Sequence, residues 1–146
     1  MSDLFDRPVV PLASESDALA TIHALQPHLQ AGESVVTLVH VVEKAGGAPD
    51  KASVEQREEK AEEIFNVALD VLADDDVYVE SEIRYHIDVA TAIVDAAADA
   101  DATAIVFTPR GGSKWVKLLT GDVADTLVET SDRPVVTLPD VEADDG

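Results

Sequence analysis

Apolar residues along the chain fall into short dense runs that are separated by longer amphipathic segments. Runs rich in valine, isoleucine and leucine predict strands at residues 9–12, 34–42, 104–107 and 135–138. The run at 34–42 has too little alternation for a one-sided sheet, so we expect a central strand buried on both faces. Residues 77–85 alternate between apolar and polar side chains, which indicates an edge strand with one face in water.

Helical spacing of apolar residues predicts four helices, one from residue 14 up to Gly32 and three at residues 51–73, 88–97 and 120–130. Asp88 is the expected N-cap of the third helix, and Gly32 is expected to end the first. Strands that alternate with helices predict an α/β fold with an open parallel five-stranded sheet and helices on both faces, because parallel neighbours need right-handed crossovers. We expect one domain over residues 1–139 and a disordered acidic tail at 140–146.

The charge balance predicts a strongly acidic surface. The chain has 30 Asp and Glu against 10 Lys and Arg, a formal net charge of -20. This charge disfavours direct binding to a nucleic-acid backbone, which depends on positive charge, so we expect no nucleic-acid partner. The 46% hydrophobic content favours a folded core over disorder. At molar salt the Debye length of about 3 Å would screen the self-repulsion of such a surface. We therefore expect a halophilic protein.

Composition also limits the chemistry. Cysteine is absent, which excludes disulfides, thiolate metal sites and thiol nucleophiles. The four histidines lie on separate predicted elements without metal-ligand spacing, so we predict no metal site. The first residues lack the features of a signal peptide, and no segment approaches the roughly 18 apolar residues of a membrane span. These features predict a soluble cytoplasmic protein without membrane insertion.

The predicted topology indicates where a ligand would bind. In an open α/β sheet, ligands bind outside the carboxyl ends of the strands, where the winding direction reverses. The loops after the first and fourth predicted strands are therefore the candidates, and they contain residues 12–14 and 108–120.

The second of these loops carries a recognisable motif. Gly111 and Gly121 are separated by nine residues, directly after a predicted strand and before a helix. This spacing resembles the G-x2-G-x9-G-[S/T] signature of the universal stress protein family, whose glycines let the backbone approach a nucleotide. The stretches 38–43 and 88–93 also resemble the family. The resemblance implies an adenine nucleotide alpha hydrolase-like fold with strand order 3-2-1-4-5. It implies ligand contacts from Leu12, Ala13, Val41, Thr108, Arg110, Gly111, Gly121, Asp122 and Val123.

Three positions depart from the family pattern. Thr108 stands at the first glycine of the signature, and Ala13 stands where the family usually has an acid. Asp122 replaces the hydroxyl residue, which would put a carboxylate beside a phosphate. We therefore expect a regulatory stress-response module rather than an enzyme, with a diverged pocket that binds ATP weakly or not at all.

Two other functions are left open by the sequence. One is a nucleotide switch with slow Mg²⁺-dependent ATP hydrolysis, in which Asp122 helps to hold the ion and Arg110 or Lys114 offsets charge. The other is a docking module for a membrane transporter or another stress-response protein, through the basic segment 114–117 around Trp115.

The last predicted strand is the expected dimer interface. It is apolar and lies between prolines. In the resembling family such a strand pairs across a dimer axis, and pairing would also cover an exposed sheet edge. We therefore predict a homodimer through Val135, Val136, Thr137 and Leu138.

Overall fold

The computed structural model describes residues 4–12, 15–43, 51–86, 88–108, 126–127 and 129–138. Strands and helices alternate along the chain, as expected from the sequence. The strands are β1 (Pro8–Pro11), β2 (Val35–Glu43), β3 (Tyr78–His86), β4 (Ala104–Phe107) and β5 (Val135–Thr137). The helices are α1 (Glu15–Leu25), the short 3-10 helix η1 (Gln26–His28), α2 (Lys51–Leu72) and α3 (Val89–Asp99). Of the predicted helix at 120–130, residues 126–127 and 129–130 are described, and they are helical.

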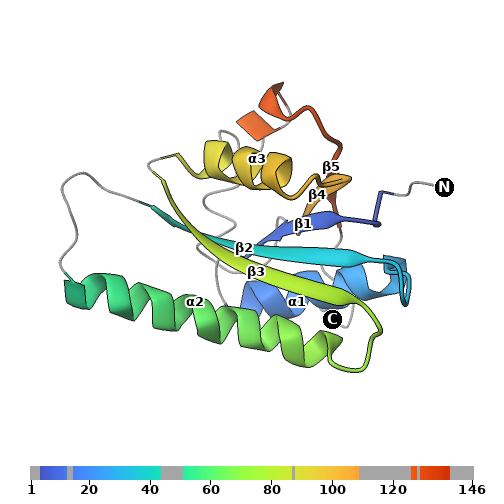
Figure 1. Ribbon diagram of the computed structural model, residues 1–146, viewed down its shortest axis with the longest axis horizontal. Coiled ribbons are helices and arrows are strands. Elements are labelled where there is room, and N and C mark those ends of the chain that lie inside the picture. The colour runs from blue at the N-terminus through green and yellow to red at the C-terminus, as the bar shows by residue number, and fades with distance from the viewer. Residues whose placement is uncertain are drawn as a thin grey trace, which may run out of the picture.

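The five strands form one parallel sheet in the order β3-β2-β1-β4-β5 (Figure 1). This is the predicted strand order 3-2-1-4-5. β1 lies at the centre, between β2 and β4, while β3 and β5 form the two edges. The chain therefore builds one half of the sheet, crosses back to the middle, and then builds the other half.

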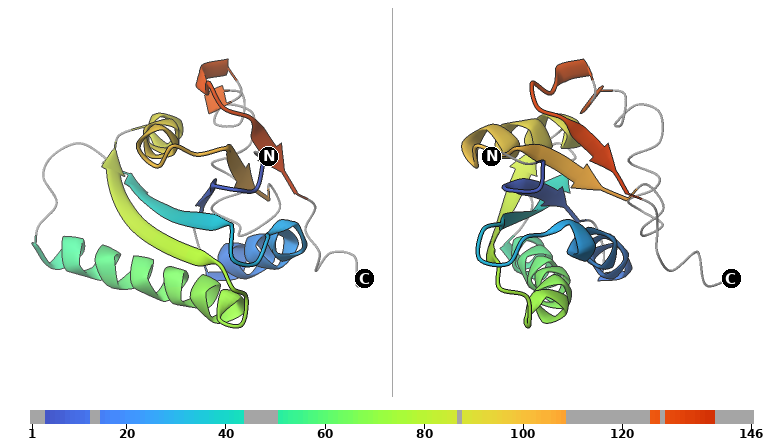
Figure 2. Two further views of the ribbon diagram at one scale, coloured as in Figure 1. Left: turned by 45° about the vertical axis from the view of Figure 1, so that its right-hand side comes forward. Right: turned by 90° about the vertical axis from the view of Figure 1, so that its right-hand side faces the viewer.

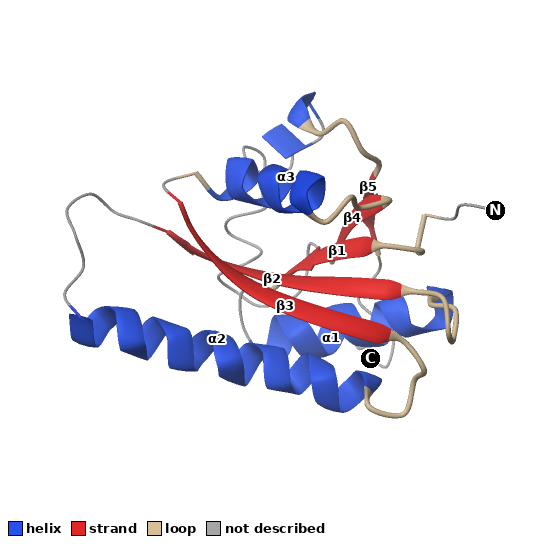
Figure 3. Ribbon diagram, viewed as in Figure 1, coloured by secondary structure: helices blue, strands red, loops and turns tan. Residues whose placement is uncertain are grey.

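Helices cover both faces of the sheet, as predicted. Helices α1 and α2 lie side by side on one face and α3 lies on the other, together with the helical residues near 127 (Figures 1 and 2). Figure 3 shows the same layering with the strands between the two groups of helices. Two apolar cores follow. One lies beneath α1 and α2 and includes Ile22 and Ile64; the other lies beneath α3 and includes Ile93 and Leu127.

The central strands supply side chains to both cores. In β2, Val36 and Leu38 belong to the core beneath α1 and α2, whereas Val39 belongs to the core beneath α3. This follows from the period of two along a strand. A strand buried on both faces needs apolar residues at nearly every position, which explains why its sequence shows little alternation. β3 is an edge strand, as predicted, and Tyr78 at its start is 72% exposed.

The first helix ends earlier than the sequence suggests. We expected Gly32 to end it, but α1 ends at Leu25 and the chain continues as η1. Pro27 lies in η1 and has no N–H with which to continue the α-helical hydrogen bonds. Gly32 instead lies in the following turn with φ of 78°, and its N–H donates to the carbonyl of Asp76.

The start of α3 agrees with the prediction. Asp88 is its N-cap: one carboxylate oxygen accepts from the backbone N–H of Ala90 at 3.1 Å and the other from the hydroxyl of Thr91 at 3.0 Å. An N-cap carboxylate satisfies one of the donors that the first helical turn leaves without a backbone partner. It therefore sets where α3 begins after the edge strand.

Candidate functional site

The winding of the sheet reverses between β1 and β4, and this is where the candidate site lies. After β1 the chain passes to α1 on one face, whereas Leu127, beyond β4, packs on the opposite face with α3. Two segments that leave neighbouring parallel strands toward opposite faces create a crevice at the carboxyl ends of those strands. β1 and β4 are neighbours in the sheet, so the topology puts the expected crevice at their carboxyl ends.

Leu12 is the last described residue before the first of the two loops. It is buried, and its N–H donates to the carbonyl of Val39 at 2.8 Å. Its own carbonyl accepts a hydrogen bond from Nδ1 of His40 at 2.8 Å. Both backbone polar groups of Leu12 are therefore held by β2.

His40 is a half-buried residue of β2 whose ring carries this contact. A carbonyl only accepts, so the hydrogen must lie on Nδ1. Burial lowers the pKa of His40, because removal from water disfavours the imidazolium; the bond to Leu12 opposes this shift, and the charge of Lys60 adds to it. Lys60 in turn lies 3.7 Å from a carboxylate oxygen of Glu15, so α1 and α2 meet near this ring.

Thr108 is the last described residue before the second loop. It is fully buried, and its hydroxyl lies 2.5 Å from the hydroxyl of Thr21 on α1, which is also fully buried. The residue before it, Phe107, accepts a hydrogen bond from the N–H of Leu138 at 2.9 Å. The side chain at the first glycine position of the family signature is therefore held against α1.

Three of the predicted ligand-binding residues are described, and they share one edge of the sheet. Pairing of Val9 with Ile105, continued along the strands, puts Leu12 level with Thr108. Val41 lies one step beyond this level on β2 and packs against the core beneath α3. The other predicted ligand-binding residues lie outside the described residues: Ala13, Arg110, Gly111, Gly121, Asp122 and Val123. The basic segment 114–117 also lies outside them.

Thr21 and His40 are two residues of this region that the sequence analysis did not assign to the site. Each is a polar residue at a position where its neighbours are core residues, such as Ile22 beside Thr21 and Val39 beside His40. A polar residue at an otherwise apolar position is a signal that the sequence does contain. The partners of these side chains are distant in sequence, however, and only the fold brings them together.

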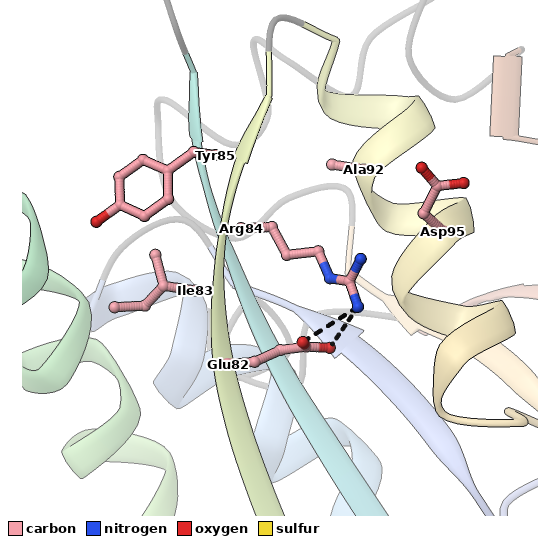
Figure 4. A pocket seen from close by; sticks show the side chains of 6 residues that line it. All are labelled: Glu82, Ile83, Arg84, Tyr85, Ala92 and Asp95. Carbon is pink, nitrogen blue, oxygen red and sulfur yellow. Dashed lines mark hydrogen bonds and ion pairs between the residues drawn. The ribbon is translucent and has the colours of Figure 1, made fainter. Parts of the chain in front are cut away.

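A separate depression of about 270 Å³ lies between β3 and α3. Figure 4 shows Arg84 at its centre, pointing from β3 toward α3. One guanidinium nitrogen of Arg84 lies 2.7 Å from Asp99 and 3.2 Å from Glu82, while Nε is buried without a hydrogen-bond partner. Burial alone would lower the pKa of Arg84, because removal from water disfavours the charged guanidinium. The hydrogen bonds to Asp99 and Glu82 have the opposite and larger effect, so the pKa is raised. Because carboxylates already engage the guanidinium, the cluster ties the edge strand to α3 and is poorly suited to bind an anion.

Other kinds of site are not indicated by the described part of the chain. Within it, no group of three or more His, Asp or Glu side chains has the arrangement of a metal site. Nor does any helix there combine the length and apolar character that a bilayer crossing requires. The crevice at the ends of β1 and β4 therefore remains the candidate site.

Comparison with known proteins identifies the family. The model of the universal stress protein family matches residues 5–139. The chain belongs to the universal stress protein family. The fold is therefore that of the family that the glycine spacing indicated. No curated protein sequence matches the chain.

Solved universal stress proteins share this fold. The universal stress protein from Archaeoglobus fulgidus, solved in complex with dAMP, is 21% identical, with a TM-score of 0.65, and the alignment covers 93% of this chain and 99% of that one. UspA from Lactobacillus plantarum is 17% identical, with a TM-score of 0.70 and coverage of 94% and 99%. A family protein from Arabidopsis thaliana, solved with AMP bound, is 13% identical, with a TM-score of 0.65 and coverage of 91% and 90%.

Proposed function

We propose that this family member is a homodimeric regulatory module of the stress response whose crevice binds an adenine nucleoside monophosphate. In this proposal ATP binds more weakly than the monophosphate or not at all. The observation that carries the proposal is the pair of anchored strand ends where the winding of the sheet reverses, in a fold shared with proteins solved with dAMP and with AMP.

The side chains at the described part of the crevice support binding rather than catalysis. Val41 is apolar and half-buried, which suits the flat face of a nucleobase. Of the side chains of a reactive type, Thr108 is fully buried against Thr21, and His40 lies on the face of β2 toward α1 and α2. A general base or a nucleophile would instead need to reach the reacting group of the ligand.

The preference for a monophosphate rests on the sequence of the second loop. Asp122 stands where the family signature has a hydroxyl residue, so a carboxylate replaces a neutral hydrogen-bonding group. Repulsion between this carboxylate and a ligand grows with the number of phosphate charges. AMP carries fewer of these charges than ATP. The net charge of -20 acts in the same direction over a longer range at low salt.

Calorimetric titration of AMP and of ATP, each with and without Mg²⁺, tests the proposal. We expect saturable binding of AMP and weaker or absent binding of ATP. In Asp122→Ser the affinity for ATP should rise roughly tenfold, because the substitution removes the repulsive charge and restores the hydroxyl. Asp125→Ser is the matched control, since it removes an equal charge three residues further on.

Two results would overturn this function. Absence of heat with both nucleotides up to millimolar concentration would mean that the crevice is not a nucleotide site. Tighter binding of ATP than of AMP, with turnover that requires Mg²⁺, would favour the slow hydrolase that the sequence left open. The docking function of the segment 114–117 concerns residues outside the described part and stays a prediction.

The dimer is proposed to form through β5. This strand is at an edge of the sheet, and among the described residues only its β4 side is paired. Val135 and Val136 are half-buried and Thr137 is exposed, so part of this edge is still accessible. An unpaired edge strand presents backbone donors and acceptors that a second copy could satisfy.

A further inference from the structure

The chain leaves β1 at Leu12, and a side chain of β2 holds it there. Regular pairing between β1 and β2 ends with Pro11 opposite Val39. Beyond this pair the ladder would continue with backbone groups, but the carbonyl of Leu12 accepts from Nδ1 of His40 instead. The imidazole thus extends the sheet's hydrogen bonding by one step at the point where the backbone turns away.

The contact with the carbonyl of Leu12 defines which nitrogen of the His40 ring carries the hydrogen. Nδ1 must carry a hydrogen in order to donate to a carbonyl. His40 lies on the face of β2 toward α1 and α2, since its neighbours Val36 and Leu38 along that face belong to the core beneath these helices. The ring is therefore confined between the sheet and the helix layer, which limits the positions available to Leu12.

The chain leaves β4 at Thr108, and a side chain of α1 holds it there. The hydroxyls of Thr108 and Thr21 are 2.5 Å apart, and both residues are fully buried. A buried hydroxyl that loses its partner keeps the cost of desolvation without the compensating bond. The pair therefore favours one position of the chain at the start of the second loop.

We propose that His40 and Thr21 are positioning residues for the crevice: from β2 and α1 they hold the two segments between which a nucleotide would bind. The inference rests on the proposed function for its ligand, but the anchoring itself depends only on the two side-chain contacts. A site whose walls are held in place before binding loses less conformational entropy when the ligand arrives. Removal of either contact should thus weaken binding although neither residue belongs to the glycine motif.

Paired variants separate the hydrogen bond from the volume of the side chain. His40→Asn keeps an N–H donor near the position of Nδ1, whereas His40→Leu fills the space without a donor. Thr21→Ser keeps the hydroxyl, whereas Thr21→Val removes it. We expect His40→Leu and Thr21→Val to weaken AMP binding about 3- to 10-fold, in keeping with the loss of one hydrogen bond. His40→Asn and Thr21→Ser should stay within about twofold of the parent chain.

Native-state hydrogen exchange supplies a second measurement that needs no nucleotide. The N–H of Leu12 donates to Val39 and the N–H of Leu138 donates to Phe107, so these amides report on the two strand ends. His40→Leu should speed exchange at Leu12 beyond the change in global stability, and Thr21→Val should do so at Leu138. The variants that keep the donor should leave both amides protected.

The two measurements distinguish failure of the function from failure of the inference. If the parent chain binds no AMP while His40→Leu and Thr21→Val still deprotect these amides, the anchoring holds and the nucleotide function is wrong. If His40→Leu matches His40→Asn in affinity and in the exchange of Leu12, the positioning role of His40 is wrong. If Thr21→Val matches Thr21→Ser in affinity and in the exchange of Leu138, the positioning role of Thr21 is wrong.

Discussion

At the scale of single residues, the chemistry of the crevice depends on polar side chains that the surrounding core keeps from water. His40 shares a face of β2 with the core residues Val36 and Leu38, Thr21 lies beside Ile22 on α1, and each bonds to a residue at a strand end. Because a buried polar group is costly without a partner, each contact is strongly selective for one geometry. Arg84 differs: it lies at the sheet edge, and its carboxylate partners are partly or largely exposed to solvent. Ion pairs of that kind contribute little to stability.

The titration of His40 leads to a pH-dependent stability. Its pKa is lowered in the folded protein, chiefly by burial and further by Lys60, so the unfolded chain takes up the proton first as the pH falls. Stability should therefore be complete above the ordinary histidine pKa of about 6.5 and decrease as the pH falls below it. We expect this decrease in urea unfolding of the parent chain relative to His40→Asn, which has no titrating ring. Parallel pH profiles for the two proteins would contradict the prediction.

At the scale of elements, the two edges of the sheet differ in length. β3 has nine residues and pairs with β2 along its whole length, whereas β5 has three. The N–H and carbonyl of one residue in a parallel strand point to the same side and alternate along it. The N–H of Leu138 donates to β4 and the carbonyl of Pro134 accepts from β4, so the even-numbered residues of this strand face β4. The backbone N–H and carbonyl of Thr137 therefore point away from β4. At the other edge, the N–H of Tyr78 donates to the carbonyl of Ser34 just before β2. Ser81 is three residues further along β3, so its N–H and carbonyl point away from β2.

This geometry gives a matched test of the proposed dimer. Thr137→Pro removes an N–H from the free side of β5 without loss of a β4–β5 bond, and we expect a monomer by light scattering. Ser81→Pro removes the corresponding N–H from the free side of β3 and should leave the dimer intact. A dimer that survives Thr137→Pro and dissociates in Ser81→Pro would assign the interface to the opposite edge. Val136→Asp would be a weaker test, because Val136 packs against the core beneath α1 and α2.

At the scale of the whole molecule, the net charge of -20 dominates the long-range electrostatics. Helix α2 illustrates the effect, since Glu55, Glu59 and Glu63 follow one another at intervals of four residues and their side chains are exposed. Like charges at this spacing lie on the same side of a helix and repel one another. Salt shortens the range of that repulsion, to about 10 Å at 0.1 M and about 3 Å at 1 M.

Unfolding measured at increasing KCl concentration tests this effect. The free energy of unfolding should rise with salt, and the triple variant Glu55→Gln, Glu59→Gln, Glu63→Gln should show a smaller rise. At low salt the triple variant should be more stable by about 0.4 to 1 kcal/mol, the sum of two relieved like-charge pairs. The same salt dependence in both proteins would mean that ion exclusion rather than charge screening is responsible. The halophilic origin expected from the composition stays a prediction.

Much of the fold could be predicted from the sequence, because it depends on local patterns. The lack of alternation in residues 34–42 predicts a strand buried on both faces, and β2 has that environment. The alternation in 77–85 predicts an edge strand, and β3 lies at the edge. The N-cap at Asp88 was likewise predictable, because a cap contacts residues two or three positions away. The end of α1 was predicted wrongly, since Pro27 stops the helical hydrogen bonding before Gly32 is reached.

The sequence by itself determined the family, through the glycine spacing, and the strand order that accompanies it. It also indicated the sheet edge at which Leu12, Val41 and Thr108 lie, since the end of each strand is a local property. Only the tertiary structure decided which side chains hold that edge. Thr21 and Thr108 are 87 positions apart, and Leu12 and His40 are 28 apart. No local pattern encodes such pairs, because each contact exists only after the sheet and its helices have packed.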